Sequence, residues 1–181
     1  MPDKRPENVV LVGFMGSGKT AIGKLASRLL GFQFLDTDQL IVDRAGRQIA
    51  DIFATDGEPA FRKLETNVLE SLSHINRCII STGGGAVLLE SNREILRSLG
   101  FVVLLNASEE TLYERISRNT KRPLLQTENP RATLSKLLAE RSEAYASAAD
   151  FTLDTTNLSH NAAAESLEAA ARTAFAWTRK A

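Results

Sequence analysis

A glycine-rich stretch near the N-terminus has the residue types and the spacing needed to bind phosphate. Residues 13–20 read GFMGSGKT and match the pattern G-x-x-x-x-G-K-[ST] between an apolar run and a helical pattern. Glycines let backbone N–H groups converge on phosphate oxygens, the lysine adds positive charge at the terminal phosphates, and the threonine hydroxyl suits Mg²⁺. The stretch therefore predicts a nucleoside triphosphate and magnesium, but it does not identify the phosphoryl acceptor.

Two aspartates separated by one residue follow a second apolar run. Residues two apart on an extended chain point to the same face, so Asp36 and Asp38 would both lie beside the phosphate loop. Asp36 would then support Mg²⁺, and Asp38 would accept the proton of an attacking hydroxyl. The alternative is structural, because Asp-x-Asp ahead of an apolar run is also typical of a helix N-cap.

An arginine–glutamate pair and a run of three glycines come next along the chain. Arg62 and Glu65 lie at positions i and i+3 of an expected helix, where they can form an ion pair. The residues Gly83–Gly85 follow a third apolar run and indicate that the backbone closely approaches either a ligand or another segment of the chain. An ordinary solvated ion pair remains the structural alternative for the first motif.

Positive charge is concentrated in the last third of the chain, at Arg115, Arg118, Lys121, Arg122 and Arg141. The polar stretch 119–129 is expected to be a loop. An arginine on such a loop can close over phosphates and stabilise the charge of a phosphoryl group during its transfer. The alternative is a solvated basic loop with no catalytic role.

The elements that must position these residues alternate between strands and helices. Short β-branched or apolar runs predict strands at 9–12, 32–35, 78–81, 101–105 and 151–153, and helical patterns separate them. Glycines at the expected helix ends and the pair Asn129-Pro130 at a helix start support these boundaries. We therefore expect one α/β domain with a parallel sheet covered on both faces and with its ligands at the carboxyl ends of the strands.

The composition narrows the possible partners and the compartment. The chain has 181 residues, and its 22 Lys plus Arg balance its 22 Asp plus Glu, which argues against a polybasic surface for nucleic acid or membrane. Its single cysteine, Cys78, forms neither an internal disulfide nor a cysteine metal site and favours a reducing compartment. No apolar run resembles a signal peptide or a membrane span, so we expect a cytoplasmic monomer.

Seven motifs occur in the order found in one family, and together they cover about residues 8–156. They are GFMGSGKT at 13–20, LDTD at 35–38, IADIF at 49–53, FRKLE at 61–65, GGGAV at 83–87, RPLL at 122–125, and Arg141 with Tyr145 four residues later. On these residues the chain resembles the shikimate kinase family. The resemblance implies a single-domain P-loop kinase fold over 1–181, with five parallel strands in the order 2-3-1-4-5. It also implies a substrate-binding helical region at 38–73 and a mobile lid at 115–127.

The resemblance further implies ATP and Mg²⁺ as cofactors and shikimate as the acceptor whose 3-hydroxyl is phosphorylated. It assigns catalytic roles to Lys19, Asp38 and Arg122. It assigns the nucleotide to Gly13, Gly16, Ser17, Gly18, Lys19, Thr20, Ala21, Arg115 and Arg122, and the metal to Thr20 and Asp36. It assigns the acceptor to Asp38, Phe53, Phe61, Arg62, Glu65, Gly83, Gly84, Gly85 and Arg141.

Within these roles, Arg62 and Arg141 would hold the substrate carboxylate, Glu65 would orient Arg62, and the two phenylalanines would line the apolar side of the ring. Some relatives carry a basic residue near adenine after the last strand. Residues 154–160 contain neither arginine nor lysine, so no adenine contact is assigned there, and His74 and His160 are given no role.

Three other functions compete with this interpretation. A kinase for another polyol acid such as gluconate would share the phosphate loop but need different residues around Asp38, Arg62 and Arg141. A nucleotide-binding regulator would have lost Lys19, Asp38 or Arg122, all of which are present. A GTPase-type switch would need a guanine-reading Asn-Lys-x-Asp stretch, which the sequence lacks.

Overall fold

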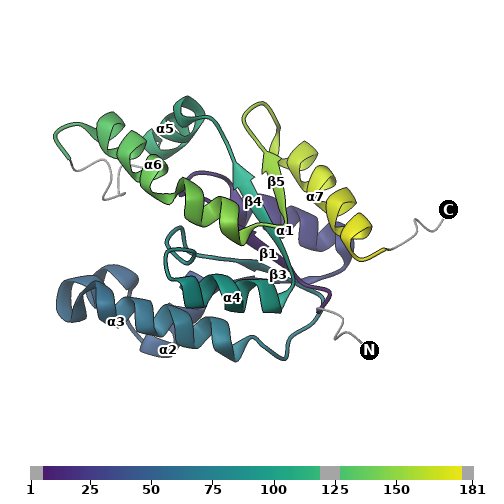
Figure 1. The fold of residues 1–181 in the computed structure, drawn as a ribbon, viewed down its shortest axis with the longest axis horizontal. Coiled ribbons are helices and arrows are strands. Elements are labelled where there is room, and N and C mark those ends of the chain that lie inside the picture. The colour runs from purple at the N-terminus through teal and green to yellow at the C-terminus, as the bar shows by residue number, and fades with distance from the viewer. Residues whose placement is uncertain (1–5, 119–126, 177–181) are drawn as a thin grey trace.

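The core of the fold is one parallel sheet, seen in the computed structural model of the chain, which describes residues 6–118 and 127–176 (Figure 1). Its strands are β1 (Val9–Val12), β2 (Gln33–Asp36), β3 (Cys78–Ser81), β4 (Phe101–Asn106) and β5 (Phe151–Asp154). Their spatial order is β2-β3-β1-β4-β5, and every neighbouring pair is parallel. The expected strands and their order are therefore confirmed.

The central strands are apolar on both sides because helices cover both faces of the sheet. In β1, Val10 and Val12 belong to one core cluster, whereas Val9 and Leu11 belong to the other, as the alternation of side chains along a strand requires. All four residues are fully buried. The continuous apolar run that predicted this strand thus reflects a sheet with no solvent-exposed face at its centre.

Seven helices of the described residues form the outer layers (Figure 1). The α1 and α7 helices pack together over one face, and α4, α6 and the end of α3 cover the other. The bounds are α1 (Lys19–Leu30), α2 (Thr37–Ala45), α3 (Ile49–Ser71), α4 (Glu90–Leu99), α5 (Glu109–Ser117), α6 (Pro130–Ala148) and α7 (His160–Ala174). No helix in these described ranges is long and apolar enough to cross a membrane.

The α2 and α3 helices form a separate lobe at one end of the sheet (Figure 1). Their small core contains Ile41, Ile52, Phe61 and Val68. The α3 helix continues across a kink at Gly57, whose φ of 80° and ψ of 174° are non-helical. Glycine adopts this conformation without strain, and Phe61, in the second half of α3, packs into the core of the lobe.

Helix ends agree with the capping residues seen in the sequence. The α1 helix ends at Gly31, which adopts the left-handed conformation. The α6 helix begins after Asn129, whose side chain accepts a hydrogen bond from the backbone N–H of Ala132. The expected ends of these two helices are therefore confirmed.

Candidate active site

The phosphate loop joins the end of β1 to the start of α1. Gly16 and Gly18 have φ angles of 83° and 96°, which only glycine adopts readily, and they turn the backbone into the helix N-terminus. The Nζ of Lys19 donates to the carbonyl oxygens of Gly13 at 2.6 Å and of Phe14 at 3.1 Å. The ammonium group is thus held over the loop, on the side where phosphates bind such loops.

A cavity of about 470 Å³ opens over this loop at the carboxyl ends of β1, β2 and β3. It is the position predicted for ligands of a parallel α/β sheet. The cavity is lined by Met15, Gly16, Gly18, Lys19, Thr20, Ala21, Asp36, Asp38, Ser81, Thr82, Gly84, Arg115, Arg118 and His160. The structure therefore brings together in one space most of the residues that the sequence assigns to nucleotide and metal, with Asp38 among them.

Asp36 makes the contacts expected of a helix cap and also lies beside the hydroxyl of Thr20, so both roles that the sequence left open are compatible with its position. Its Oδ1 caps α2 by accepting the backbone N–H groups of Asp38 at 3.1 Å and Gln39 at 3.5 Å. Its Oδ2 accepts the Thr20 hydroxyl at 3.2 Å. The assumption that both aspartates lie on extended chain is wrong, because Asp38 already belongs to the first turn of α2. Both carboxylates nevertheless line the same cavity.

Asp38 is half-buried, and its Oδ1 is buried without a hydrogen-bond partner. Burial, followed by the charge of Asp36, raises its pKa above the ordinary value, while the positive charges of Lys19 and Arg62 act in the opposite direction. Asp38 thus lies between the lysine of the phosphate loop and an arginine on α3. A carboxylate in this state is suited to accept a proton from a hydroxyl group placed in the cavity.

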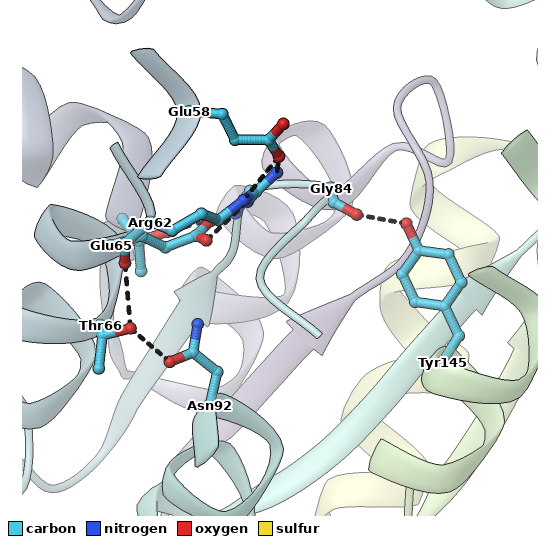
Figure 2. Close-up of polar contacts among 9 residues, drawn as sticks. Glu58, Arg62, Glu65, Thr66, Gly84, Asn92 and Tyr145 are labelled. Carbon is cyan, nitrogen blue, oxygen red and sulfur yellow. Dashed lines mark hydrogen bonds and ion pairs between the residues drawn. The ribbon is translucent and has the colours of Figure 1, made fainter. Parts of the chain in front are cut away.

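Arg62 is the centre of an ionic network on α3 (Figure 2). Its Nη1 donates to Glu65 at 2.7 Å, which confirms the predicted i, i+3 pair. Its Nε and Nη2 donate to one oxygen of Glu58, at 3.1 and 3.0 Å. On the same helix, Thr66 donates to the backbone oxygen of Arg62 at 3.0 Å and contacts the buried Asn92 of α4 at 2.7 Å, which fixes this turn against α4.

The three glycines after β3 make room for these charged side chains. A Cβ on Gly85 would lie 2.5 Å from both terminal nitrogens of Arg62, and one on Gly83 would lie 2.7 Å from Oδ1 of Asp38 and 3.1 Å from Oε1 of Glu65. A side chain at either position would have to displace these charged groups. Other segments thus approach Gly83 and Gly85 closely, and contact of the glycines with a ligand stays a prediction. The carboxylates of Asp38 and Glu65 thus both lie against Gly83.

Tyr145 on α6 ties the glycine run to the opposite side of the site. Its hydroxyl donates to the carbonyl oxygen of Gly84 at 2.5 Å (Figure 2). Burial raises the pKa of Tyr145 to about 12, with Arg141 and Arg62 opposing the shift, so both guanidinium groups lie near this phenol. Arg141 also lies over the ring of Phe14 of the phosphate loop, 5.5 Å from the centroid.

We expect Tyr145→Phe to raise the KM for the acceptor several-fold and to lower the free energy of unfolding by about 0.5–1.5 kcal/mol. The change removes only the hydroxyl, which leaves the Gly84 carbonyl without this donor and frees the glycine run from α6. Urea denaturation and steady-state kinetics would measure the two effects. An equal rise in the KM for ATP would contradict a role confined to the glycine run.

Two phenylalanines of α3 meet across its kink. The rings of Phe53 and Phe61 have centroids 4.6 Å apart, with Phe61 buried and Phe53 39% exposed. The guanidinium carbon of Arg62 lies 5.3 Å from the centroid of the Phe61 ring. The pair therefore offers an apolar surface beside the arginine, as an acceptor with an apolar ring and a carboxylate would require.

The loop after β5 contributes to the site, although the sequence assigned it nothing. Arg115 of α5 donates to the carbonyl oxygen of Thr155 at 2.9 Å, to its hydroxyl at 3.2 Å and to the Gly16 carbonyl oxygen at 3.5 Å. His160, which is the first residue of α7, lines the same cavity, and Ser159 before it caps the helix. The helix start directly after a strand end was the available signal, because ligands bind at that edge.

The stretch 115–127, which is expected to be a lid, is described only at its margins. Residues 115–118 close α5 and line the cavity through Arg115 and Arg118, and residue 127 precedes α6. Arg122, together with the rest of the stretch 119–126, lies outside the described residues.

A second cavity, of about 710 Å³, adjoins the first along β2 and α2. The two share Thr20, Asp36 and Asp38, and the second extends toward Lys24 and Gln48. Neither Arg62 nor Arg141, the two predicted carboxylate-binding residues, lines either of these two cavities.

The fold and the site together define the class of protein. A parallel sheet that runs through a phosphate loop into a helix, with a buried carboxylate and an arginine network facing that loop, is the architecture of a P-loop kinase for a small acceptor. The model of the shikimate kinase family matches residues 15–171. The chain therefore belongs to the shikimate kinase family.

Individual relatives agree with this assignment. A shikimate kinase of Thermodesulfovibrio yellowstonii is 42% identical over 161 residues, which cover 89% of this chain and 92% of the relative. One of Symbiobacterium thermophilum is 49% identical over 144 residues, which cover 78% of this chain and 83% of the relative. The structure of the Acinetobacter baumannii shikimate kinase in complex with shikimate superposes with a TM-score of 0.84 at 39% identity, covering 91% of this chain and 92% of that one.

Proposed function

We propose that the protein transfers the γ-phosphoryl group of ATP to the 3-hydroxyl of shikimate, producing shikimate 3-phosphate and ADP. The observation that carries this proposal is the position of Asp38. Asp38 lines the cavity over the phosphate loop, and its carboxylate is close enough to Lys19 and to Arg62 for both positive charges to act on it. A hydroxyl group that contacts Asp38 would face the phosphate loop, while the rest of the acceptor would extend toward Arg62.

The acceptor is held by charge at one end and by apolar contacts along one face. The guanidinium groups of Arg62 and Arg141 would bind the shikimate carboxylate, since the planar fork matches the two oxygens of a carboxylate. Phe53 and Phe61 would pack against the ring. Gly84, fixed by Tyr145, would contribute its backbone beside the ring hydroxyls.

The nucleotide is held by the phosphate loop, where Gly13, Gly16, Ser17, Gly18 and Ala21 would supply backbone N–H groups. Lys19 would neutralise the terminal phosphates. Arg115, fixed to the loop after β5, would lie along the nucleotide with His160. We propose that the lid over 115–127 brings Arg122 to the γ-phosphate and excludes water, which would limit hydrolysis of ATP without transfer.

The chemistry is then mainly a matter of position and charge. Phosphoryl transfer has a loose transition state, so alignment of the hydroxyl with the γ-phosphorus and neutralisation of the equatorial oxygens supply most of the rate. Asp38 would hold the 3-hydroxyl in line and take its proton on the carboxylate. Lys19 and Arg122 would stabilise the charge on the moving group.

The residues at the loop also fit Mg²⁺. Mg²⁺ prefers oxygen ligands, and in nucleotide sites it takes only one or two from the protein and the rest from phosphates and water. The Thr20 hydroxyl and the Asp36 carboxylate, 3.2 Å apart at the cavity wall, supply such a pair, the latter through a water molecule. When bound, the metal would neutralise part of the negative charge of the phosphates.

We expect Asp36→Asn to raise the Mg²⁺ concentration for half-maximal activity by about 10–100-fold. Asparagine caps helices about as well as aspartate, so the cap of α2 is kept while the charge at the metal site is lost. A magnesium titration of the initial rate, with thermal melts of both proteins, would separate the effects. A destabilised variant with an unchanged magnesium dependence would show that Asp36 serves only as the cap.

The reaction itself is tested by ADP release with Mg-ATP, with and without shikimate, and with gluconate and quinate as controls. We expect saturable release with shikimate alone, matched by shikimate 3-phosphate. Release with gluconate would keep the phosphate loop but overturn the roles of Asp38, Arg62 and Arg141. ATP binding without release for any acceptor would favour a nucleotide-binding regulator instead.

We propose further that the chain functions as a cytoplasmic monomer with one domain and without a nucleic-acid partner. The balanced charge of the sequence supports this. Light scattering of the eluted protein would then give a mass near the 19.8 kDa of one chain.

A further inference from the structure

The guanidinium group of Arg62 is closely surrounded, and 16% of the side chain is exposed. Glu65, which is fully buried, takes Nη1. Gly85 lies so close that a Cβ there would be 2.5 Å from both terminal nitrogens, and Phe61 covers the group at 5.3 Å. The edge formed by Nε and Nη2 is what remains for a ligand, and two parallel N–H groups on one edge are the donors that a carboxylate binds in a bidentate pair.

Glu58 occupies that edge (Figure 2). Its Oε1 accepts from Nε at 3.1 Å and from Nη2 at 3.0 Å. The side chain is 59% exposed, whereas that of Glu65 has no exposed surface. Glu58 can therefore leave Arg62 for water at little cost, but Glu65 cannot leave without stranding a buried charge.

We propose that Glu58 takes the place of the substrate carboxylate on Arg62 in the ligand-free protein and that the acceptor must displace it. The inference rests on the proposed function, in which Arg62 binds the carboxylate of shikimate. Glu58 follows the kink at Gly57 and so lies at the N-terminus of the second half of α3. A released carboxylate there remains favourable beside the positive end of the helix dipole.

The consequence is selectivity among anions. A carboxylate tethered to the same helix acts at an effective concentration of order mM, so a simple anion with no other anchor competes poorly for Arg62. Shikimate also has its ring and its hydroxyls to bind, and these contacts offset the loss of the Glu58 pair. Glu58 thus lowers the affinity of Arg62 for every carboxylate ligand. Only a ligand with further contacts in the site then binds well.

The test is the affinity of Glu58→Gln for shikimate, measured by calorimetry without nucleotide. We expect binding about 2–5-fold tighter than in the unsubstituted protein, the range for loss of an exposed competing ion pair. Glu70→Gln is the matched control, because Glu70 is an exposed glutamate on the same helix, beyond the buried contacts of Arg62. It should leave the affinity unchanged.

A second ligand that lacks the carboxylate charge of shikimate provides a further control. The methyl ester of shikimate cannot displace a carboxylate from Arg62, so Glu58→Gln should not improve its binding, and the preference for acid over ester should rise by the same 2–5-fold. Unchanged or weaker binding of shikimate to Glu58→Gln would overturn the inference, since Glu58 would then support Arg62 or bind the acceptor. An equal gain for acid and ester would also overturn it, because it would indicate a general loosening of α3.

Benzoate separates this inference from the proposed function. As a simple carboxylate it should bind Glu58→Gln about 2–5-fold tighter than the unsubstituted protein, whichever acceptor is phosphorylated. If the unsubstituted protein neither binds nor phosphorylates shikimate while the benzoate affinity rises in the variant, the proposed acceptor is wrong and the role of Glu58 stands. If shikimate is phosphorylated but neither carboxylate binds the variant more tightly, only the role of Glu58 is wrong.

Discussion

Replacement of Asp38 by asparagine is expected to lower kcat by about 10²–10⁴-fold. The amide keeps the size of the side chain and its place in the first turn of α2, but it cannot take the proton of the acceptor hydroxyl. Initial rates at saturating ATP and shikimate would measure the loss, and shikimate binding by calorimetry would show that the site still forms. A loss below tenfold would reduce Asp38 to a residue that merely lines the cavity.

The same substitution has an expected pH dependence. Because burial raises the pKa of Asp38, the acid limb of kcat/KM should lie above the ordinary aspartate range near 3.9 and should disappear in Asp38→Asn. The native state binds this proton more tightly than the unfolded state, so stability is lost as the pH rises through the interval between the two pKa values. At neutral pH the ionised carboxylate is therefore destabilising, and the asparagine variant should melt at a higher temperature despite its inactivity.

Replacement of Arg62 by alanine is expected to lower kcat/KM for shikimate by about 10²–10³-fold while leaving the affinity for ATP nearly unchanged. Loss of a desolvated, bidentate charge pair has an effect of this size, and Arg62 lies on α3, outside the lining of the nucleotide cavity. Steady-state kinetics would measure kcat/KM for shikimate, and calorimetry would measure the affinity for ATP. Equal losses for both ligands would contradict a role restricted to the acceptor carboxylate.

The control for this variant follows from Glu65. Its side chain is fully buried, so removing Arg62 alone leaves an unpaired internal charge that is expected to destabilise the fold by about 3–5 kcal/mol. The double variant Arg62→Ala with Glu65→Gln removes that charge and should recover much of the stability but none of the shikimate affinity. Recovery of both would mean that the single variant failed through folding, and that Arg62 does not bind the acceptor.

Local patterns predicted the frame of the molecule well because each depends on neighbours in the chain. The apolar run at 9–12 was enough to predict a strand, because it reflects burial on both faces of a sheet. Capping residues a few positions away predicted the end of a helix at Gly31 and the start of another at Asn129. The pair of Arg62 and Glu65 was predictable for the same reason, since one helical turn fixes it. Asp36 was predicted in two competing roles, and its two oxygens allow both.

Contacts between distant segments escaped the sequence. No motif within residues 154–160 indicates that Thr155 accepts hydrogen bonds from Arg115, 40 residues away in the sequence. Only the general rule that ligands bind where strands end points to His160. Tyr145 belongs to one of the sequence motifs, but the sequence assigned it no role. The structure shows that its hydroxyl donates to the carbonyl oxygen of Gly84. Glu58 belongs to none of the sequence motifs, and its contact with Arg62 depends on how the fold arranges the groups around that guanidinium.

The sequence by itself determined the phosphate loop, the alternating elements and the family, because a backbone turn that binds phosphate needs its glycines, lysine and threonine at fixed spacing in one short segment. The tertiary structure decided the ionisation and the neighbours of the acidic groups. Asp38 has a raised pKa only because α2, the glycine run and α3 enclose it together, and burial is a property of the packed elements rather than of any one of them.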